Sequence, residues 1–443
     1  MLKTFKKGGV HPAENKLSAH APIIKAEIPK TVTIPLGQHI GAPSSPIVTK
    51  GETVKVGQII AKSNGFVSAN IHSSVSGVVA KIEDTFDITG FSRPAISITV
   101  DGDDWLETID RTETINSNLD YQPEHIIKRV QESGIVGLGG ATFPTHIKLS
   151  VPTGKKAEFL IINGVECEPY LTADHRLMME KGEQVLIGTK LLMAALGVNK
   201  AYICIENNKP DAIQHLMQLA KKYQPIQVVP LKVKYPQGGE KQLINAVLKR
   251  EVPSGGLPID LGVIVQNVGT AFAVYEAVQK NKPLFERIVT VTGKTVKKPS
   301  NFLVRIGTPA IQLVEAAGGI PDDTGKIVAG GPMMGKALNS LDVPITKGAS
   351  GILLFDRKEG KRLPISPCIR CGKCVSVCPM GLEPYLLMTL SEKQIWDRSE
   401  KENTMDCMEC GSCMYTCPAN RPLLDYIRLS KSTVGQLIRT RKQ

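Results

Sequence analysis

Aromatic side chains and long apolar runs are both scarce in this sequence. Only 5% of its 443 residues are aromatic, so a surface that binds nucleic acid by stacking bases on aromatic rings is not expected. Apolar runs such as 191–198 and 261–268 fall well short of the roughly 18 residues that a membrane-spanning helix needs. Residues 1–9 carry lysines without an apolar core behind them, so we expect no secretory signal. These absences predict a cytoplasmic protein with neither a transmembrane segment nor a nucleic-acid partner.

Cysteine is scarce outside one region near the C-terminus. Eight of the ten cysteines lie between residues 368 and 417. The other two, Cys167 and Cys204, have no second cysteine nearby, and we interpret them as packed thiols. This distribution is consistent with a reducing compartment.

The eight clustered cysteines form two matching runs, each reading C-x2-C-x2-C-x3-C-P. With this spacing, the first three thiolates of a run bind one [4Fe–4S] cluster and the fourth is a ligand of the other cluster. Two zinc sites would leave the third cysteine of each run unexplained, and disulfide frameworks are typical of short secreted chains. The predicted ligands are Cys368, Cys371, Cys374 and Cys417 for cluster 1, and Cys407, Cys410, Cys413 and Cys378 for cluster 2.

The charge balance is basic, with 54 lysines and arginines against 42 acids and a formal net charge of +12. Such a surface attracts nucleic acid, anionic lipid headgroups, nucleotide phosphates or an acidic protein. Near the C-terminus six basic residues accompany a single acid, Asp425. This tail is either solvated or docks on a membrane-embedded partner or the cytoplasmic lipid surface. The six residues are Arg421, Arg428, Lys431, Arg439, Arg441 and Lys442.

Residues 1–110 combine short β patterns with turn residues. The segments 51–60 and 69–82 resemble the two halves of the barrel-sandwich hybrid of biotinyl and lipoyl carrier domains. Those carriers present a lysine at the hairpin that joins their halves, whereas residues 63–70 contain none. We expect a scaffold or docking domain without a swinging arm, in which His72 has a packing or hydrogen-bonding role.

Residues 120–290 alternate helix and strand patterns. Helices are predicted at 123–133, 182–196 and 211–223, and short strands at 159–162, 201–205, 227–233 and 262–265. Such alternation favours a helix-flanked sheet, with a nucleotide site in its loops.

Four loops of this domain carry glycine or polar residues. The first, 134–144, lacks the Gly-Lys-Ser/Thr of a P-loop, and Thr142 occupies the last position of G-x-G-x-x-G. It is either a tight turn or a backbone cradle for phosphate or an isoalloxazine ring. Polar turns at 163–169, 235–240 and 266–270 follow strands or strand-like segments, where α/β proteins bind ligands.

Together these segments resemble the flavin- and NADH-binding subunit of respiratory complex I. With the N-terminal barrel and the double cluster motif, the chain is more similar still to the C-subunit family of Rnf complexes, membrane-bound ferredoxin:NAD oxidoreductases that pump ions. Residues 5–16 and the turn 330–335, Gly-Gly-Pro-Met-Met-Gly, are typical of that family. The resemblance covers essentially the whole chain.

The resemblance implies a non-covalent FMN and an NADH that stacks on it. It departs from the complex I pattern at Leu138, Thr142, Val165 and Gly239, where that pattern has arginine, glycine and two acids. The segment 140–142 also resembles the threonine motif for covalent FMN in other Rnf subunits. The implied FMN contacts are Gly137, Gly139, Gly140, Ala141, Lys148, Asn163, Glu166, Tyr235, Gly238, Gly239, Asn267 and Thr270, and the implied NADH contacts are Phe143, Glu168 and Glu240.

The expected architecture is multidomain, of mixed α/β and α+β class. It comprises a barrel-sandwich hybrid (1–110), an α/β FMN and NADH domain (120–290), a small β-grasp domain of the soluble-ligand-binding type (291–345) and a helical ferredoxin-type domain with two [4Fe–4S] clusters (346–443). Met333 and Met334 are interpreted as packing residues beside a turn.

The resemblance implies an NADH-linked oxidoreductase subunit. Hydride would pass between NAD(H) and FMN, and single electrons would pass through the clusters. The implied partners are membrane-bound subunits of the same complex, with ferredoxin acting through them, and the implied location is the cytoplasmic face of the membrane. Two alternatives stay open: a cobalamin reductase of the propanediol-utilisation type, and an electron-transfer scaffold with an empty flavin site.

Overall fold

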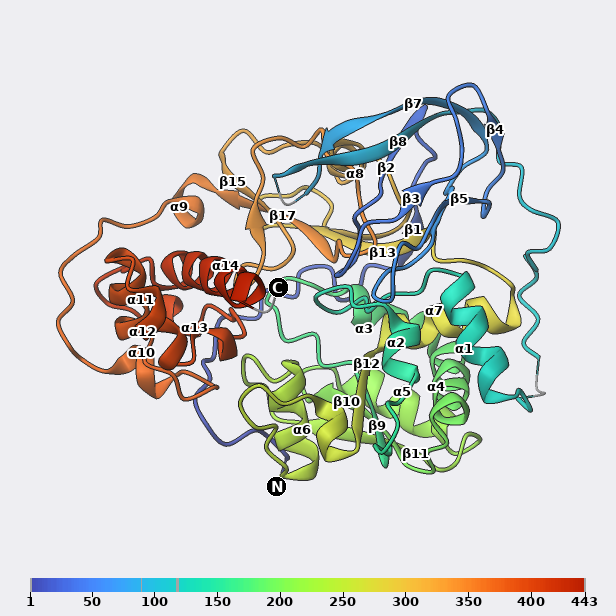
Figure 1. The fold of residues 1–443 in the computed structure, drawn as a ribbon. Helices are drawn as coiled ribbons and strands as arrows, with labels where there is room; N and C mark the ends of the chain where they lie inside the picture. The colour runs from blue at the N-terminus through green and yellow to red at the C-terminus, as the bar shows by residue number, and fades with distance from the viewer. Residues whose placement is uncertain (1, 89, 117–118, 442–443) are drawn as a thin grey trace.

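The computed structural model describes residues 2–88, 90–116 and 119–441. Figure 1 shows a β-rich unit at the upper right, an α/β unit at the lower right, a mixed sheet between them and a helical unit at the left. This arrangement confirms the predicted multidomain class and the order of its parts.

Two antiparallel sheets form the N-terminal barrel-sandwich unit. Alternate residues of its strands are buried, as Val32 and Ile34 show with no exposed surface, because a strand turns successive side chains to opposite faces. The hairpin between the halves leaves Phe66 80% exposed. The strands are β2 (Thr31–Pro35), β8 (Ser92–Val100), β7 (Gly77–Phe86) and β4 (Thr53–Val54) in one sheet, and β3 (Ser45–Pro46), β5 (Ile59–Lys62) and β6 (Ile71–His72) in the other.

A four-stranded parallel sheet forms the centre of the α/β unit. Its strands are β9 (Phe159–Asn163), β10 (Ala201–Glu206), β11 (Ile226–Leu231) and β12 (Val263–Asn267), in the spatial order β11-β10-β9-β12. Relative to chain order this reads 3-2-1-4, so the direction of winding reverses between β9 and β12. Open α/β sheets bind ligands at the carboxyl ends of strands at such a switch point.

Helices cover both faces of this sheet. On one face α4, α5 and α7 pack against the strands and α1 packs outside them on α4 and α7, while α6 packs on the other face. The helices α4 and α7 approach so closely that a Cβ at Gly188 would lie 1.8 Å from the Ala271 carbonyl oxygen. The helices are α1 (Pro123–Glu132), α4 (Gly182–Leu196), α5 (Pro210–Ala220) and α7 (Val268–Gln279) on the first face, and α6 (Glu240–Leu248) on the second. The predicted helices and strands of this unit are confirmed to within a few residues, whereas α6, α7 and the short α2 (Thr145–Leu149) and α3 (Ala173–Glu180) were not predicted.

A six-stranded sheet with the order β1-β14-β13-β17-β15-β16 lies between the barrel and the α/β unit. It takes β1 from the N-terminal segment and β17 from residues that follow 345. Its elements are β1 (Ile23–Lys25), β13 (Glu286–Thr292), β14 (Ser300–Arg305), α8 (Ala310–Ala316), β15 (Thr324–Ala329), β16 (Lys336–Ala337) and β17 (Gly351–Asp356).

The helical unit repeats one local pattern around its two cysteine runs. In each run a glycine in the left-handed region, Gly372 or Gly411, ends the C-x2-C turn and begins a short helix that carries the third cysteine. A side chain there would strain the backbone. The helices are α9 (Arg357–Gly360), α10 (Lys373–Ser376), α11 (Pro384–Glu392), α12 (Trp396–Lys401), α13 (Ser412–Tyr415) and α14 (Leu423–Arg441).

The basic tail forms α14, which packs against α11 and α12. Acids elsewhere in the helical unit pair with most of its cations: Glu409 binds Arg428 and Lys431, and Arg441 binds Asp397 and Glu400. The tail is therefore a packed helix with cations at its surface, as the 53% exposed Arg441 shows. Lys442 lies outside the described residues. Across the described part of the chain, no helix combines the length and apolarity that a membrane crossing requires.

Residues 3–18, which we call the N-terminal strap, cross between the α/β and helical units. Lys3 bridges Leu231 at the end of β11, and Val10 pairs with Tyr235. The Gly9 amide donates to the Val377 carbonyl at 2.8 Å. Close packing at Gly8 leaves no room for a side chain, because a Cβ there would lie 2.5 Å from the Cys378 backbone. The strap thus fixes one cysteine run against the α/β unit.

Candidate functional site

The strand ends at the switch point place two asparagines side by side. Asn163 at the end of β9 and Asn267 at the end of β12 are paired in register. Asn267 caps α7, because its Oδ1 accepts from the Gly269 amide at 2.7 Å. Its Nδ2 donates to Asp174 Oδ2 at 2.7 Å and to the Asn163 carbonyl at 3.3 Å. The parallel sheet therefore brings together residues that lie about a hundred positions apart.

The glycine loop folds over these asparagines. The Leu138 amide donates to Thr270 Oγ1 at 3.0 Å, which ties the loop to the first turn of α7. At Gly139 a Cβ would lie 2.7 Å from Asn267 Nδ2, so only glycine fits without displacing that amide. At Gly140, by contrast, a Cβ would meet nothing within 4 Å. The loop thus presents bare backbone toward open space.

Lys148 and Glu240 form an ion pair beside this loop. Lys148 Nζ donates to Glu240 Oε1 at 2.7 Å and to the Val265 carbonyl at 3.2 Å. Glu240 is the first residue of α6, and Gly239 at the N-cap position has no side chain that could cap the helix. Asn163 Nδ2 reaches the same region and donates to the Gly238 carbonyl at 2.8 Å. One cation, one acid and two amides therefore converge at the carboxyl end of the sheet.

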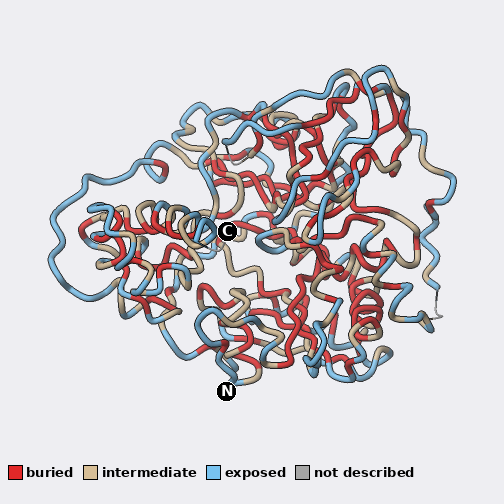
Figure 2. Tube along the Cα trace, in the orientation of Figure 1, coloured by how far each residue is buried: buried red, intermediate tan, exposed pale blue. Residues whose placement is uncertain are grey.

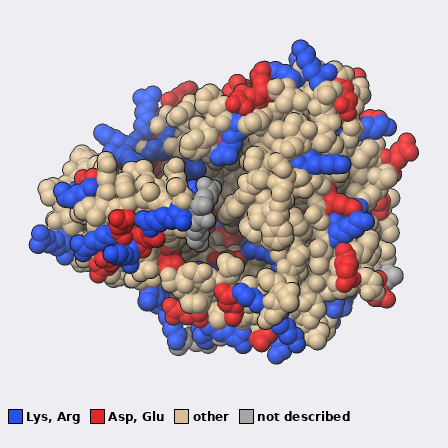
Figure 3. All heavy atoms as spheres, in the orientation of Figure 1, with Lys and Arg blue, Asp and Glu red and all other residues tan. Residues whose placement is uncertain are grey.

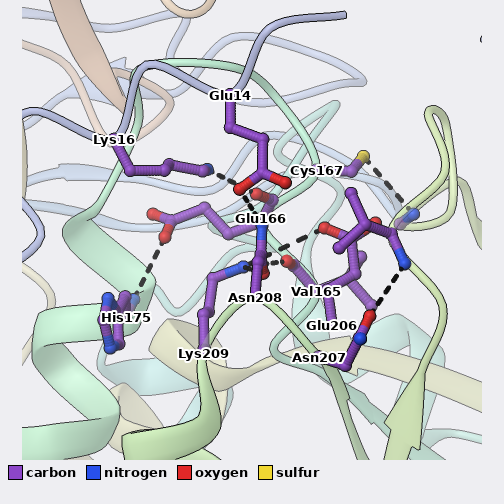
Figure 4. Close-up of polar contacts among 12 residues, drawn as sticks. Glu14, Lys16, Val165, Glu166, Cys167, His175, Glu206, Asn207, Asn208 and Lys209 are labelled. Carbon is purple, nitrogen blue, oxygen red and sulfur yellow. Dashed lines mark hydrogen bonds and ion pairs between the residues drawn. The ribbon is translucent and has the colours of Figure 1, made fainter. Parts of the chain in front are cut away.

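Glu166 is held away from solvent by the helix that follows it. Its carboxylate accepts from the backbone amides of Asp174 at 2.8 Å and His175 at 3.2 Å, at the N-terminus of α3. The Glu166 backbone has a φ of +45°, which turns the chain sharply. Lys16 of the N-terminal strap donates to the carbonyls of Glu166, Glu168 and Leu171 at 2.7–2.9 Å. Figure 4 shows Lys16 reaching this turn from the strap.

A second buried lysine supports the same turn from below. Lys209 Nζ donates to the Val165 carbonyl at 2.8 Å and lies 4.0 Å from the Glu206 carboxylate (Figure 4). Both side chains are 2% exposed. Burial raises the pKa of Glu206 to about 7 and lowers the pKa of Lys209 to about 8. The turn is thus fixed by charged groups on both sides.

Glu168 points toward the 330–335 turn between β15 and β16. Its carboxylate accepts from the backbone amides of Met333 at 3.1 Å and Met334 at 2.8 Å, and its Oε1 lies 3.4 Å from the Tyr235 hydroxyl oxygen. At Gly331 a Cβ would lie 2.2 Å from this carboxylate, which explains the glycine there. Burial raises the pKa of Glu168 to about 7, despite the lowering effect of the two amides.

We expect the pH dependence of stability to reveal this buried acid. Between about pH 4.3, the ordinary pKa of glutamate, and pH 7, folded Glu168 holds a proton that the unfolded chain has lost. Its contribution to stability therefore falls as pH rises through this window, by on the order of 1–3 kcal/mol. The Glu168→Gln variant cannot titrate, so its melting temperature should rise relative to that of the wild type between pH 4.5 and pH 7. Parallel melting curves of the two proteins from pH 5 to 8 would contradict this assignment.

The turn that follows β11 connects the two units. The Tyr235 hydroxyl donates to the Cys410 carbonyl at 2.8 Å. The Met408 methyl group packs against Gly239, where a Cβ would lie 2.5 Å from it. Gln242 of α6 donates to the Pro379 carbonyl at 3.3 Å. The α/β site therefore contacts both cysteine runs at the residues assigned to cluster 2.

The cysteines assigned to cluster 2 line one cavity. Cys378, Cys407, Cys410 and Cys413 face it together with apolar side chains, and the amides of Leu382 and Glu409 donate to the sulfurs of Cys378 and Cys407. Among the described residues, no three His, Cys, Asp or Glu side chains are close enough to hold one metal ion. In a cubane, each of the four thiolates binds a different iron. The ligands of a [4Fe–4S] cluster therefore need not lie close enough to share one ion, and the four cysteines of this cavity suit such a cluster.

The cysteines assigned to cluster 1 are more open. Cys374 and Cys417 are half-buried and pack in one apolar group. Cys368 and Cys371 are exposed. The two predicted sites thus differ in depth, with cluster 2 inside and cluster 1 at the surface.

The structure brings most of the predicted flavin residues together, but not all of the predicted nicotinamide residues. Glu240 lies beside Lys148, whereas Glu168 is bound to the 330–335 turn and Phe143 closes the base of the glycine loop. Among the predicted flavin residues, Gly140 and Ala141 lie at the tip of the glycine loop, and Glu166 and Tyr235 stabilise the surrounding turns. The others converge at the strand ends: Gly137, Gly139, Lys148, Asn163, Gly238, Gly239, Asn267 and Thr270.

Several charged residues that support the site gave no sequence signal. Arg287 is 8% exposed, donates to the carbonyls of Leu138 and Lys347, and lies near Asp174. Burial lowers the pKa of Arg287 to about 10, and burial together with the charge of Glu166 raises the pKa of Asp174 to about 7. Each reaches the site from a distant segment, so no local motif includes them.

The residues present fit a flavin mononucleotide. The open backbone at Gly140 leaves room for a flat ring, since no protein atom would meet a Cβ there. Lys148, Asn163 and the N-terminus of α6 supply hydrogen-bond donors for carbonyl and phosphate oxygens, and Asn267 holds Asp174 and the Asn163 backbone in place beside them. Leu138 does not occupy this space, because it is 9% exposed and packs into the core.

Four family models match the chain in succession. They are the RnfC barrel sandwich hybrid domain at residues 3–103, the Nuo51 FMN-binding domain at 130–276, the SLBB domain at 288–337 and a 4Fe-4S dicluster domain at 363–418. The matches to the flavin-binding and dicluster models cover the two sites described above.

Curated relatives match over nearly the whole chain. The C subunit of the proton-translocating ferredoxin:NAD(+) oxidoreductase complex of Clostridium ljungdahlii is 50% identical over 436 residues, covering 98% of this chain and 94% of its own. The C subunit of the Na(+)-translocating complex of Acetobacterium woodii is 47% identical over 433 residues, covering 97% of each. Among solved structures, an NAD+-reducing [NiFe]-hydrogenase aligns with a TM-score of 0.51 at 18% identity over 73% of this chain and 67% of that one, which is a similarity of fold.

Proposed function

Since the chain belongs to the family of C subunits of ion-translocating ferredoxin:NAD oxidoreductase complexes, we propose that it is the subunit at which such a complex exchanges electrons with NAD(H). The protein is an oxidoreductase subunit that binds FMN and two [4Fe–4S] clusters. Bound FMN exchanges a hydride with NAD(H) and single electrons with the clusters. Two contacts carry the proposal, those of Tyr235 with Cys410 and of Gly239 with Met408, because they join the flavin-binding strand ends to the cluster 2 cavity.

In this proposal the chain's own residues hold the flavin and do no acid–base chemistry. Hydride transfer needs the two rings held face to face, not a proton donor. Gly139 and Gly140 give the flavin ring close access to backbone, and Asn163 and Lys148 orient it through hydrogen bonds. The flavin is held non-covalently.

Nicotinamide binds on the open side of the glycine loop in this proposal. Glu240 borders that side, and its ion pair with Lys148 keeps both groups in place. Val165 is fully buried, so the acid present at this position in the complex I pattern has no counterpart here. Glu168 acts on nicotinamide only indirectly, by fixing the Tyr235 turn.

The depths of the two cysteine sets support an order for the relay. Cluster 2, held by Cys378, Cys407, Cys410 and Cys413, is the neighbour of the flavin, because its loops contact Tyr235, Gly239 and Gln242. Cluster 1, with exposed Cys368 and Cys371, is the outer centre. Electrons enter or leave the protein there. The partners are membrane-bound subunits of the same complex, and the protein works at the cytoplasmic face of the membrane.

Anaerobic titration with NADH tests the function directly. Purified protein should contain one FMN and about eight irons, as two [4Fe–4S] clusters require, and NADH should bleach its flavin absorbance. Acid precipitation should release the flavin into the supernatant. Flavin that does not respond to NADH would rule out the dehydrogenase role, and flavin-free protein with full iron would identify an electron-transfer scaffold. The domain order and the relatives already favour this family over cobalamin reductases.

A further inference from the structure

The segment 361–373 leads into the first cysteine run and is exposed at every one of its residues. Figure 2 shows it as a continuous exposed stretch at the left edge of the molecule, between α9 and α10. The segment is nevertheless fixed to the helical unit. The Ser366 amide donates to the Ala419 carbonyl at 3.0 Å, and Asn420 Nδ2 donates to the Pro364 carbonyl at 3.1 Å. These bonds hold it beside Cys417.

Three large apolar side chains of this segment face solvent. Leu363, Ile365 and Ile369 are 62%, 60% and 66% exposed. Single exposed apolar residues are common, but several together next to a functional group indicate an interaction surface. Here the functional groups are the exposed thiols of Cys368 and Cys371.

The same segment carries cations that no acid neutralises. Within the described ranges, none of Lys358, Lys361, Arg370 and Lys373 takes part in an ion pair, and all four are exposed. The neighbouring acids are already engaged, since Glu359 binds Lys294 and Asp425 binds Arg362. This differs from α14, where most of the basic side chains are paired. Figure 3 shows Lys and Arg side chains gathered at this left end of the molecule.

We propose that Lys358 and residues 361–373 form a docking surface for an acidic electron-transfer protein that exchanges electrons with cluster 1. This inference rests on the proposed function, because it takes the exposed cysteines to be ligands of the outer centre. The exposed apolar side chains would form the dry centre of the interface, and the unpaired cations would form a rim that attracts carboxylates. An anionic lipid surface would satisfy the cations, but it offers no centre that can accept an electron.

Charge reversal at a distance from the cluster ligands tests this surface. The Lys358→Glu/Lys361→Glu variant is compared with Lys393→Glu/Lys401→Glu, which makes the same charge change at exposed positions after α11 and at the end of α12. Each purified full-length protein is added to membrane vesicles from cells that lack this chain. Ferredoxin-dependent NAD+ reduction is then measured against the amount of protein added.

The docking variant should need about ten-fold more protein for half-maximal rate at about 0.1 M salt, and the difference should shrink at high salt. The control should match the wild type. A Leu363→Ser/Ile365→Ser variant should weaken rebinding at both salt concentrations. All variants should keep NADH-dependent reduction of ferricyanide, because ferricyanide accepts electrons without the partner. If the wild-type protein does not reduce ferricyanide with NADH, the proposed function itself is refuted.

Two results would overturn the docking surface. One is an unchanged half-saturation for the Lys358→Glu/Lys361→Glu variant. The other is an equal loss of binding by this variant to protein-free vesicles of anionic phospholipid, which would assign the cations to the membrane.

Discussion

Replacing Cys413 by serine should disconnect the flavin from the outer cluster. Cys413 is 9% exposed and faces the cavity that Cys378, Cys407 and Cys410 also line, so the variant should lose cluster 2 and about half of the iron. NADH should still bleach the flavin and drive reduction of ferricyanide. It should fail to reduce the remaining cluster, whereas dithionite should reduce it. Electron paramagnetic resonance spectra recorded after NADH and again after dithionite show which of the two reductants reduces the cluster.

The matched variant is Cys368→Ser at the exposed cysteine of cluster 1. It should also lose about half of the iron, yet NADH should reduce the cluster that remains. Both variants should lose ferredoxin-dependent NAD+ reduction in the assembled complex. Cys204→Ser, at a buried thiol far from both runs in sequence, should keep all of its iron. If NADH reduces the remaining cluster only in the Cys413 variant, the order of the relay is the reverse of the one proposed.

Replacing Gly140 by alanine should weaken flavin binding without unfolding the protein. An added Cβ meets no protein atom within 4 Å, and the Gly140 backbone lies outside the left-handed region. The only group it can obstruct is a ligand that lies against the loop. Overpacking of this kind costs about 1–3 kcal/mol, which corresponds to a rise in the flavin Kd of about five-fold to a hundred-fold. Flavin fluorescence during titration of the apoprotein with FMN measures it.

Gly139→Ala is the comparison for this variant. Its Cβ would lie 2.7 Å from Asn267 Nδ2, so it should lower the melting temperature of the apoprotein as well as the flavin affinity. Gly140→Ala should leave the melting temperature of the apoprotein unchanged. Wild-type flavin affinity in the Gly140→Ala protein would mean that the flavin does not contact the loop tip, and would move the proposed ring position toward Asn163 and Lys148.

The unpaired cations of the helical unit lie elsewhere than the sequence led us to expect. The sequence concentrates cations near the C-terminus, which suggested either a solvated tail or a docking tail. In the folded protein Glu409 and the acids of α12 neutralise much of α14, and the unpaired cations lie beside the first cysteine run. A count of charges along the chain cannot show which of them meet an acid across the fold.

The sequence by itself determined the features that depend on local spacing. The C-x2-C-x2-C-x3-C-P runs predicted two clusters because the ligands of one cubane lie within a few residues of each other. The strands β9, β10, β11 and β12 were predictable because buried parallel strands are short apolar segments between turns. The short helices α2 and α3 were missed, since five to eight residues give too few helical turns to show a period.

Only the tertiary structure decided how these parts face one another. The bond from Tyr235 to Cys410 and the contact of Gly239 with Met408 join residues that are some 170 positions apart, and they set cluster 2 against the flavin-binding loops. Glu168 follows a strand as a ligand-binding acid would, yet it turns to the amides of Met333 and Met334. Lys16 reaches it from the N-terminal strap. These contacts arise from the packing of whole units, in which the direction of a side chain is set by neighbours that are distant in the sequence.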